Sequence, residues 1–363
     1  YKRQKIFYPE GNDKMKKNAE FLASYIKEIT GYELATATGQ PGKGISLVID
    51  QSIQNPEGYQ LTVSDNGIRI AGSTDAGVFY GIQTLRKSIP ATAQGMNVEL
   101  PAATINDYPR FAYRGMMLDV SRHFFPVDSV KTYLDILALH NQNTFHWHLS
   151  DDQGWRIEIK KYPELAEIGG QLPNNGRKGG YYTQEEFKDL VNYANERFIT
   201  IIPEVDIPGH TAAVFAAYPD FKNAVKFKTK VNIPGQAFNA LDVDDPKAMQ
   251  FTEDVIAELA ALAPGNYIHI GGDEAIGLPH DKFVRFINKT REIVLKNGKK
   301  MVGWQETARA DISEGDVIQH WIYLKQKSED SSKKKDNIPA EYKEIMALFA
   351  EFMKEAPKDP GLG

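Results

Sequence analysis

The sequence contains no cysteine, which excludes disulfide bonds and metal sites built from thiolates. It also lacks any apolar run long enough to cross a membrane as a helix. Basic residues are not in excess, because 43 lysines and arginines stand against 48 acidic residues, for a formal net charge of −5. Even the lysine-rich stretch 325–335 contains Glu329 and Asp330, which favours a solvated loop. We therefore expect no nucleic-acid partner and no membrane span in this sequence.

The composition is that of an ordinary globular protein, with 42% apolar and 25% charged residues. A chain of 363 residues can form a barrel of about 250 residues and a smaller domain. Residues 1–105 predict that smaller domain, of the α+β class and without a catalytic cluster of its own. In it we expect a helix ended by Gly31, a strand, a hairpin around Asp65-Asn66-Gly67 and a second helix, over residues 14–29, 45–49, 59–70 and 76–87.

From residue 113 onward, predicted strands and helices alternate along the chain. We expect strands at 113–119, 143–149, 199–206, 266–272, 299–304 and 316–321. The helices between them are expected near 127–141, 184–197, 246–262 and 280–297. This alternation predicts a parallel sheet covered by helices.

Polar and aromatic side chains gather where these strands end, in the stretches 119–122, 148–152, 204–210, 273–274, 304–306 and 320–321. In a β/α barrel, functional groups lie at the carboxyl ends of the strands. An open, doubly wound sheet would instead carry a glycine-rich phosphate loop after an early strand, and none is evident. The predicted fold is therefore α/β, a TIM-type (β/α) barrel over residues 106–321 that follows the small α+β domain.

The stretch Gly271-Gly272-Asp273-Glu274 ends an apolar strand with two neighbouring carboxylates. Glycines allow the backbone to bend tightly and to approach a ligand closely. Adjacent acids repel each other, and burying either without a partner costs several kcal/mol. A solvated acidic turn explains an isolated pair, whereas a glycosidase uses such a pair by keeping one carboxyl protonated beside a charged one.

Arg122 either pairs with Asp119 at the barrel rim or holds two neighbouring sugar hydroxyls with its guanidinium. His146 and His148 point to the same side of their strand. With the acids that follow, they form either a metal site or a pair of hydrogen-bonded core residues. The other strand ends supply tryptophan and glutamate in place of further histidines, so the metal site is the weaker interpretation. Asp151 is then expected to take a sugar hydroxyl.

Asp206 either caps a Pro-Gly turn or orients His210 toward a ligand or a catalytic carboxyl. Trp304 and Trp321 stand at the ends of the last two recognised strands. Indole faces stack on the C–H faces of pyranose rings, although a single tryptophan is more often a core residue. Two of them beside acids, an arginine and a histidine favour a sugar-binding site.

Five motifs occur in the order in which one enzyme family carries them: LDVSRHF at 118–124, FHWHLSDD at 145–152, PEVDIPGH at 203–210, HIGGDE at 269–274 and WQE at 304–306. Together they resemble the β-N-acetylhexosaminidases of glycoside hydrolase family 20. The resemblance covers residues 1–321, because the first domain is similar to the small α+β domain that precedes the barrel in that family.

The resemblance implies an exo-acting, retaining glycosidase that needs no cofactor, no metal and no enzyme nucleophile. The substrate's own 2-acetamido oxygen attacks the anomeric carbon and forms an oxazolinium-like intermediate. By the same resemblance, Glu274 protonates the leaving oxygen and later activates water, so it must be neutral while its neighbour is charged. Asp273 orients the acetamido N–H and stabilises the positive charge that develops there.

The resemblance also assigns the remaining contacts of the substrate. It implies that Arg122 binds the hydroxyls far from the scissile bond, that Asp151 and His210 support the polar network, and that Trp304 and Trp321 line the acetamido pocket. The implied substrates are glycans with terminal GlcNAc or GalNAc, and the oligomeric state stays open. Because of this substrate class and the absence of cysteine, we expect a periplasmic or secreted protein.

After Trp321 the sequence departs from the family pattern. The family continues with two more strands that carry a tyrosine, an aspartate and a Trp/Glu pair. Here residues 322–363 predict a lysine-rich loop, an amphipathic helix and a Pro-Gly-rich end, and Tyr323 has no assigned role. This departure leaves open an N-acetylhexosamine-binding protein that is impaired in catalysis. Independently of it, the pattern of His146 and His148 leaves open a metal-dependent barrel hydrolase.

Overall fold

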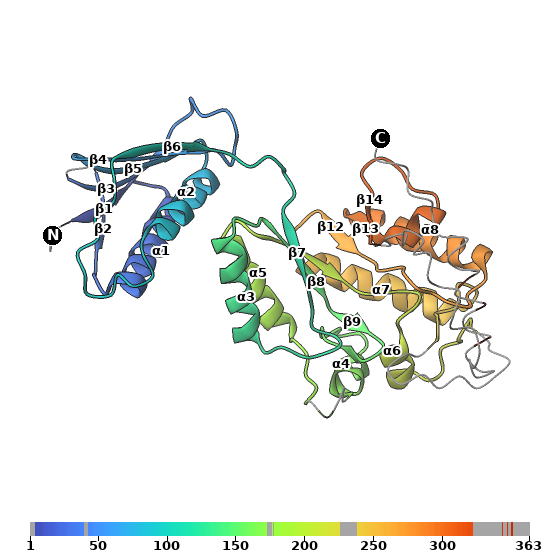
Figure 1. The fold of residues 1–363 in the computed structure, drawn as a ribbon. Helices are drawn as coiled ribbons and strands as arrows, with labels where there is room; N and C mark the ends of the chain where they lie inside the picture. Colours follow the sequence, from blue (N-terminus) through green and yellow to red (C-terminus); the bar gives the residue numbers. More distant parts are fainter. Residues whose placement is uncertain are drawn as a thin grey trace, which may run out of the picture. The chain divides into compact units, whose positions relative to one another are not determined.

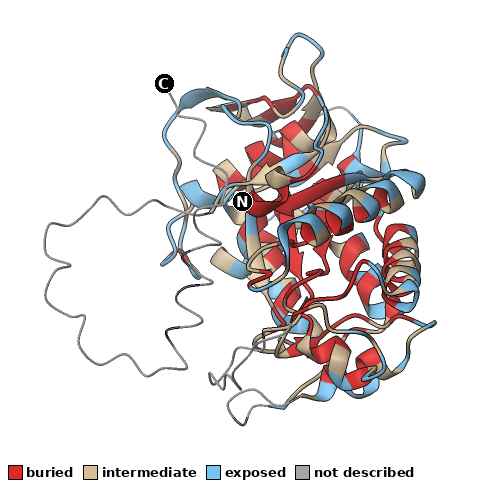
Figure 2. Ribbon diagram, turned by 90° about the vertical axis from the view of Figure 1, so that its right-hand side faces the viewer, coloured by how far each residue is buried: buried red, intermediate tan, exposed pale blue. Residues whose placement is uncertain are grey.

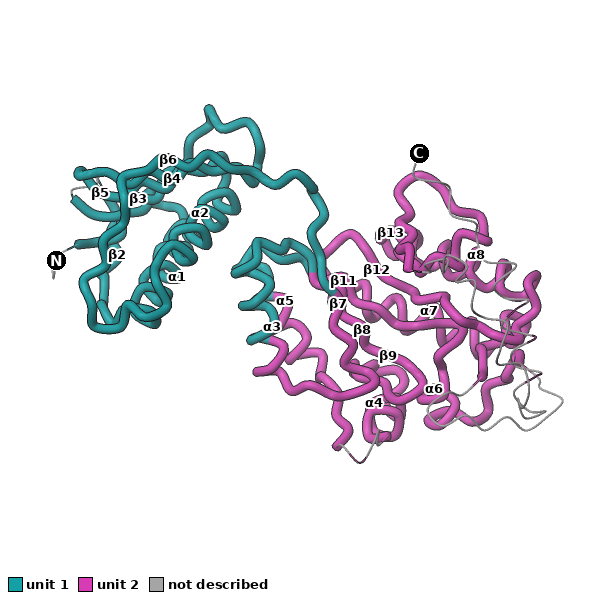
Figure 3. The backbone as a smooth tube through the Cα atoms, viewed as in Figure 1, with its two compact units in different colours: residues 1–116, 131–144, 192–200 teal, residues 117–130, 145–191, 201–363 magenta. Residues whose placement is uncertain are grey.

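The computed structural model describes residues 4–39, 43–172, 176, 178–225 and 238–321, with single residues at 343, 347 and 350. It divides into the two compact units coloured in Figure 3, one of residues 1–116, 131–144 and 192–200, the other of residues 117–130, 145–191 and 201–363. Apart from those three single residues, the predicted tail over 322–363, Tyr323 included, lies outside the described residues. The domain boundaries after residues 105 and 321 stay predictions.

The first unit contains a six-stranded sheet with two helices along one face, as Figure 1 shows. Its strand order is β2-β1-β3-β5-β4-β6, in which β4 runs antiparallel to β5 and β6. The strands are β1 Lys5–Tyr8, β2 Ala35–Thr38, β3 Gly44–Ile49, β4 Tyr59–Ser64, β5 Gly67–Gly72 and β6 Ala103–Asp107. The helices are α1 Asp13–Thr30 and α2 Asp75–Ser88. The predicted α+β domain, with its hairpin and both helices, is confirmed.

Local chemistry sets the ends of α1. The Asn12 side chain accepts the backbone N–H of Met15 at 3.0 Å, which satisfies one of the free donors of the first turn. Gly31 adopts a φ of 77° and donates its N–H to the carbonyl of Lys27. A left-handed residue costs glycine little, so the predicted end of the helix at Gly31 is confirmed.

The second sheet consists of six strands among the described residues, in the order β14-β13-β12-β11-β8-β7. They are β7 Gly115–Asp119, β8 Thr144–His148, β11 Thr200–Glu204, β12 Tyr267–His269, β13 Lys300–Trp304 and β14 Val317–Gln319. The long helices between them are α3 Val127–Leu139, α5 Gln184–Asn195, α7 Pro246–Leu262 and α8 His280–Lys296. The pairings of β11 with β12, β12 with β13 and β13 with β14 are parallel. This curled parallel sheet with its helices is the predicted TIM-type barrel fold.

Several short elements lie in the loops that follow the strands, and the sequence patterns did not predict them. They are the hairpin β9 Ser150–Asp151 and β10 Gly154–Trp155, the helices α4 Glu164–Glu167 and α6 Ala212–Ala217, and the 3₁₀ turns η1 Gly169–Gln171 and η2 Gln305–Arg309. Of the helices in the described ranges, none combines the length and the apolar character that crossing a membrane requires.

The central strands of this sheet are buried on both faces, as Figure 2 shows. Strand β8 is buried along its whole length although it contains His146 and His148. Glu204 at the end of β11 and His269 at the end of β12 are buried as well. Buried polar groups need hydrogen-bond partners, so the polar residues at these strand ends must pair with one another.

Candidate active site

The two neighbouring acids follow β12 through a backbone bend that requires glycine. Gly271 and Gly272 have φ values of 69° and 89°, and Glu274 has a φ of 40°. A Cβ atom on Gly271 would lie 1.9 Å from Oδ1 of Asp206. That oxygen accepts the backbone N–H of Gly272 at 3.0 Å. The glycines therefore allow a buried carboxyl to approach the backbone directly before the acid pair.

His210 lies against both acids of the pair. Its Nε2 atom is 3.6 Å from Oε2 of Glu274 and 3.8 Å from Oδ2 of Asp273, and both distances exceed a hydrogen bond. The other ring nitrogen, Nδ1, is 3.1 Å from Oδ1 of Asp151. Burial opposes a charge on the imidazole, but Asp206 and Asp151 outweigh it and raise the pKa of His210 well above its ordinary value. The pair is thus next to a cation oriented by Asp151.

Asp151 joins three cationic side chains. Its carboxylate lies 2.8 Å from Nη2 of Arg122, 2.9 Å from Nε2 of His148 and 3.1 Å from Nδ1 of His210. Burial alone would raise its pKa, but these partners hold the pKa of Asp151 well below its ordinary value. The side chain is 1% exposed and is held by these three partners, and its expected contact with a sugar hydroxyl stays a prediction. Arg122 also pairs with Asp119 at 2.9 Å, so it takes part in both the rim and the network.

Of the two roles left open for Asp206, the structure does not show the hydrogen bond that would orient His210. The hydrogen bond that orients His210 comes from Asp151, because the Oδ1 atom of Asp206 is directed at the backbone of Gly272. Asp206 still attracts the His210 imidazole electrostatically. Burial, and next the charge of Asp273, raise the pKa of Asp206 well above its ordinary value.

Burial also raises the pKa of Asp273, although His210 and a hydrogen bond with Asp206 act against it. The resemblance implied a charged Asp273, whereas burial raises the pKa of this carboxyl and so favours its neutral form. The Oδ1 atom of Asp273 is buried and makes no hydrogen bond to any described residue. It is therefore an acceptor available to an N–H group of a ligand.

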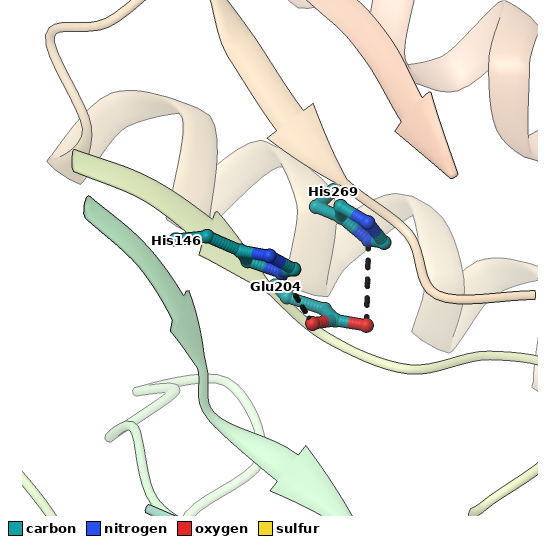
Figure 4. A group of neighbouring side chains, drawn as sticks. All are labelled: His146, Glu204 and His269. Carbon is teal, nitrogen blue, oxygen red and sulfur yellow. Dashed lines mark hydrogen bonds and ion pairs between the residues drawn. The ribbon is translucent and has the colours of Figure 1, made fainter. Parts of the chain in front are cut away.

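A second cluster surrounds Glu204 inside the barrel (Figure 4). Its carboxylate lies 2.6 Å from Nε2 of His146 and 2.7 Å from Nδ1 of His148, and it accepts the indole N–H of Trp304 at 2.8 Å. Burial alone would raise the pKa of Glu204, but the neighbouring histidines hold it well below its ordinary value. Burial would likewise lower the pKa of His148, but Glu204 and Asp151 keep it well above its ordinary value. His148 is therefore an imidazolium between two carboxylates.

The ligand atoms of His146, Glu204 and His269 lie within 4.8 Å of one another, a spacing that suits a metal ion. However, Nδ1 of His269 accepts the N–H of Gly271 at 3.0 Å, and the indole of Trp304 donates to Glu204. Burial lowers the pKa of His269 to about 3, so its ring is neutral. Hydrogen-bond donors thus occupy lone pairs of His269 and Glu204 that a metal could use, which supports the interpretation of these histidines as hydrogen-bonded core residues.

Trp304 and Trp321 lie beside each other with ring centroids 6.4 Å apart and planes at 68°. The indole of Trp321 donates to Oε2 of Glu306 at 3.0 Å. Glu306 is fully buried, and burial, with a smaller contribution from the charge of Asp273, raises its pKa to about 7. Glu306 belongs to one of the recognised motifs, but no role was predicted for it.

Two family models cover most of the chain. The model described as "Glycosyl hydrolase family 20, catalytic domain" matches residues 111–350, and "Glycosyl hydrolase family 20, domain 2" matches residues 2–108. The chain belongs to glycoside hydrolase family 20. The barrel and the preceding α+β domain are thus the catalytic domain and domain 2 of a family 20 protein.

The chain is similar to other members of family 20 both in sequence and in structure. A beta-hexosaminidase of Porphyromonas gingivalis is 36% identical over 85% of this chain and 44% of its own length. A beta-N-acetylhexosaminidase of Cellulomonas fimi is 36% identical over 73% of this chain and 53% of its own length. The chain thus spans about half the length of these two curated relatives. The solved GH20 beta-N-acetylhexosaminidase of Streptomyces coelicolor has a TM-score of 0.81 and 37% identity, and the match covers 96% of this chain and 69% of that one.

All seven predicted site residues lie in the second unit, after strands of the barrel. The structure brings five of them into one polar network: Arg122, Asp151, His210, Asp273 and Glu274. The two tryptophans contact each other and bond to Glu204 and Glu306, which the sequence did not single out as site residues. The signal for both glutamates was present, since each belongs to a family 20 motif at a strand end. The roles of all these residues in substrate binding stay predictions.

Proposed function

We propose that this family 20 protein is an exo-acting, retaining β-N-acetylhexosaminidase that removes terminal GlcNAc or GalNAc from glycans. The observation that carries the proposal is the acid pair after β12. There the buried Oδ1 atom of Asp273 accepts no hydrogen bond from any described residue. The neighbouring Glu274 side chain is partly exposed. The two acids have different surroundings, as a reaction with an acid role and a charge-stabilising role requires.

In the first step, the acetamido carbonyl oxygen of the substrate forms a bond to the anomeric carbon while the bond to the leaving oxygen breaks. Glu274 donates its proton to that leaving oxygen, and its 28% exposed side chain suits contact with a substrate. In the second step, water attacks the anomeric carbon, the acetamido oxygen leaves it, and the Glu274 carboxylate takes the proton of the water. His210, 3.6 Å away, stabilises that carboxylate.

Asp273 acts on the acetamido nitrogen in the same steps. The N–H group of the substrate donates to the Oδ1 atom, which positions the carbonyl oxygen for attack. As the oxazolinium-like intermediate forms, positive charge on the nitrogen strengthens this contact. An interaction that is stronger in the transition state than in the bound substrate accelerates the chemical step.

Arg122 is the proposed contact for the hydroxyls far from the scissile bond. Its side chain remains 39% exposed, although it pairs with both Asp119 and Asp151. Two carboxylates hold the guanidinium fork in one orientation, which lowers the entropy lost when it binds a sugar. A terminal sugar carries free hydroxyls on the side away from the scissile bond, so the proposed contact with Arg122 agrees with exo action.

Hydrolysis of p-nitrophenyl β-N-acetylglucosaminide beside the plain β-glucoside tests the proposal. We expect cleavage of the acetamido substrate alone, because the glucoside lacks the internal nucleophile. Glu274→Gln should lower kcat about 10²–10⁴-fold on a chitobiose-type disaccharide, whose leaving group needs a proton, and less on the nitrophenyl substrate. The exposed Glu292→Gln is the matched control.

Equal cleavage of both nitrophenyl substrates would refute the acetamido mechanism. The alternative of a binding protein impaired in catalysis is not favoured, because the acid pair and its network are assembled in the structure. If the protein were such a binding protein, wild type would show no activity for Glu274→Gln to remove. The variant would then bind N-acetylglucosamine with nearly unchanged affinity.

A further inference from the structure

Each of the two neighbouring tryptophans donates its indole N–H to a buried glutamate. Trp304 donates to Oε1 of Glu204 at 2.8 Å, and Trp321 donates to Oε2 of Glu306 at 3.0 Å. Both glutamates are fully buried. The histidine cluster accounts for Glu204, whereas Glu306 has no part in the proposed reaction. A buried carboxyl is costly to retain, so its function calls for an explanation.

Glu306 and Trp321 lie just beyond the paired ends of strands β13 and β14. Strands β13 and β14 pair in parallel, with Trp304 opposite Gln319. Glu306 lies in the 3₁₀ turn η2 that follows β13, and Trp321 lies two residues after the end of β14. The indole–carboxyl hydrogen bond therefore joins the segments that follow these two strands, beyond the end of the sheet ladder.

This bond fixes the plane of the Trp321 ring. An indole side chain has two rotatable bonds, and a hydrogen bond at Nε1 combined with an edge contact leaves one arrangement of both. The edge contact is the perpendicular packing against Trp304, with planes at 68°. Glu204 fixes the Trp304 ring by the same kind of bond. The two hydrogen bonds thus hold the two rings in a defined orientation relative to each other.

We propose that Glu306 is a positioning residue, which holds Trp321 in the orientation that the acetamido pocket requires before a substrate arrives. This inference rests on the proposed function for the identity of the ligand. Glu306 in turn depends on Trp321, because removing the indole N–H would leave Oε2 of Glu306 buried without this donor. The two residues should therefore behave as one unit when they are substituted.

The first experiment observes the bond itself. Protein labelled with ¹⁵N-tryptophan gives indole N–H signals from its four tryptophans, and Trp321→Phe identifies the signal of Trp321. In Glu306→Leu, which is similar in volume but accepts no hydrogen bond, we expect that signal to move upfield and its hydrogen exchange to accelerate about tenfold. Glu306→Gln, which retains an acceptor oxygen, should restore most of the wild-type signal. An unchanged Trp321 signal in Glu306→Leu would overturn the proposal.

The second experiment measures the consequence for substrate. Glu306→Leu is expected to raise KM for p-nitrophenyl β-N-acetylglucosaminide about tenfold, with a smaller change in kcat. Trp321→Phe should have a similar effect, and the double variant should be no worse than the poorer single variant. Glu306→Gln should recover most of the affinity. Additive effects in the double variant, about a hundredfold in total, would show that Glu306 does not act through Trp321.

The outcome for the proposed function is read separately, from the wild-type protein. If the wild type hydrolyses no N-acetylhexosaminide, the proposed function fails, and the same double-variant comparison is made on the dissociation constant for N-acetylglucosamine. Coupling there would still support the positioning role, and additivity would still overturn it. If the wild type does not bind this sugar either, the pocket that Trp321 is proposed to line does not exist, and the inference falls with it.

Discussion

Replacing Glu306 by glutamine is expected to stabilise the barrel at neutral pH and to have little effect in acid. Glu306 is fully buried, and burial, aided by Asp273, raises its pKa from the ordinary 4.5 to about 7. In the unfolded chain the same carboxyl is exposed to water and ionises near 4.5. Between these values the folded protein retains a proton that the unfolded chain has released.

The sign and the size of the effect follow from this difference. Since the folded state binds more protons in this range, the free energy of unfolding falls as the pH rises. The contribution of Glu306 is fully present below pH 4.5 and is lost by about pH 7. A difference between 4.5 and about 7 corresponds to about 3 kcal/mol. Glutamine cannot ionise, and its oxygen can still accept the indole N–H of Trp321.

Urea unfolding followed by tryptophan fluorescence measures this effect in the barrel alone, because all four tryptophans belong to the second unit: Trp147, Trp155, Trp304 and Trp321. The stability difference between Glu306→Gln and wild type should grow by about 3 kcal/mol between pH 4.5 and pH 8. The exposed Glu292→Gln on α8 is the control for loss of one carboxyl. A difference that stays constant over this range would mean that the pKa of folded Glu306 is close to the ordinary 4.5, and the burial argument would be refuted.

Three further results are expected. Gly271→Ala should lower the free energy of unfolding in urea by about 3 kcal/mol, because a φ of 69° is strained for alanine and the new Cβ would collide with Asp206. The control Gly298→Ala has a φ of 72° but open space around its Cβ, so it should lower this free energy by about 1 kcal/mol. Binding of N-acetylglucosamine should lower the raised pKa of Asp273 and release protons, seen as a buffer-dependent heat in calorimetry that Asp273→Asn abolishes. Arg122→Lys should raise KM about tenfold with little change in kcat, because an ammonium cannot bridge Asp119 and Asp151 as the fork does; a loss confined to kcat would contradict this.

The elements of the barrel could be predicted from the sequence because each one is specified by its own residues. Helix α7 was predicted at 246–262 and occupies the same residues, and β13 differs from its prediction by one residue at its start. Local periodicity and flanking glycines suffice for such elements. The motifs likewise placed the site residues after the correct strands, since the carboxyl ends of parallel strands meet at one edge of a sheet.

The pairing between strand ends could not be predicted in the same way. Asp206 is closer to His210 in sequence than Asp151 is, yet Asp151 makes the hydrogen bond. The choice depends on the short hairpin β9–β10, which directs Asp151 into the site, and on the bend at Gly271, which directs Asp206 to the backbone. Both are tertiary features that a periodic pattern does not contain. For the same reason, the contact between Glu306 and Trp321 could not be predicted, because it depends on the 3₁₀ turn η2 that follows β13.

The charges around one part of the site alternate in sign. Arg122 lies between Asp119 and Asp151, and the His148 imidazolium lies between Asp151 and Glu204. Each buried anion in this row has a cation within hydrogen-bond distance, so the pKa values of Asp151 and Glu204 are held low despite burial. This part of the site stays ionised, which suits the fixed donors and acceptors that the proposed binding of a sugar requires.

The acids around β12 and β13 have raised pKa values, in contrast to Asp151 and Glu204. Asp206 and Asp273 both depend on His210 for positive charge, and Glu306 lies beside Asp273, so burial prevails and raises the pKa of all three. A second ionised carboxylate there would face uncompensated repulsion until positive charge arrives. The proposed acetamido group brings an N–H donor first and a cationic nitrogen as the intermediate forms. The stabilisation of Asp273 as a carboxylate therefore increases along the reaction, which is the property that distinguishes transition-state binding from substrate binding.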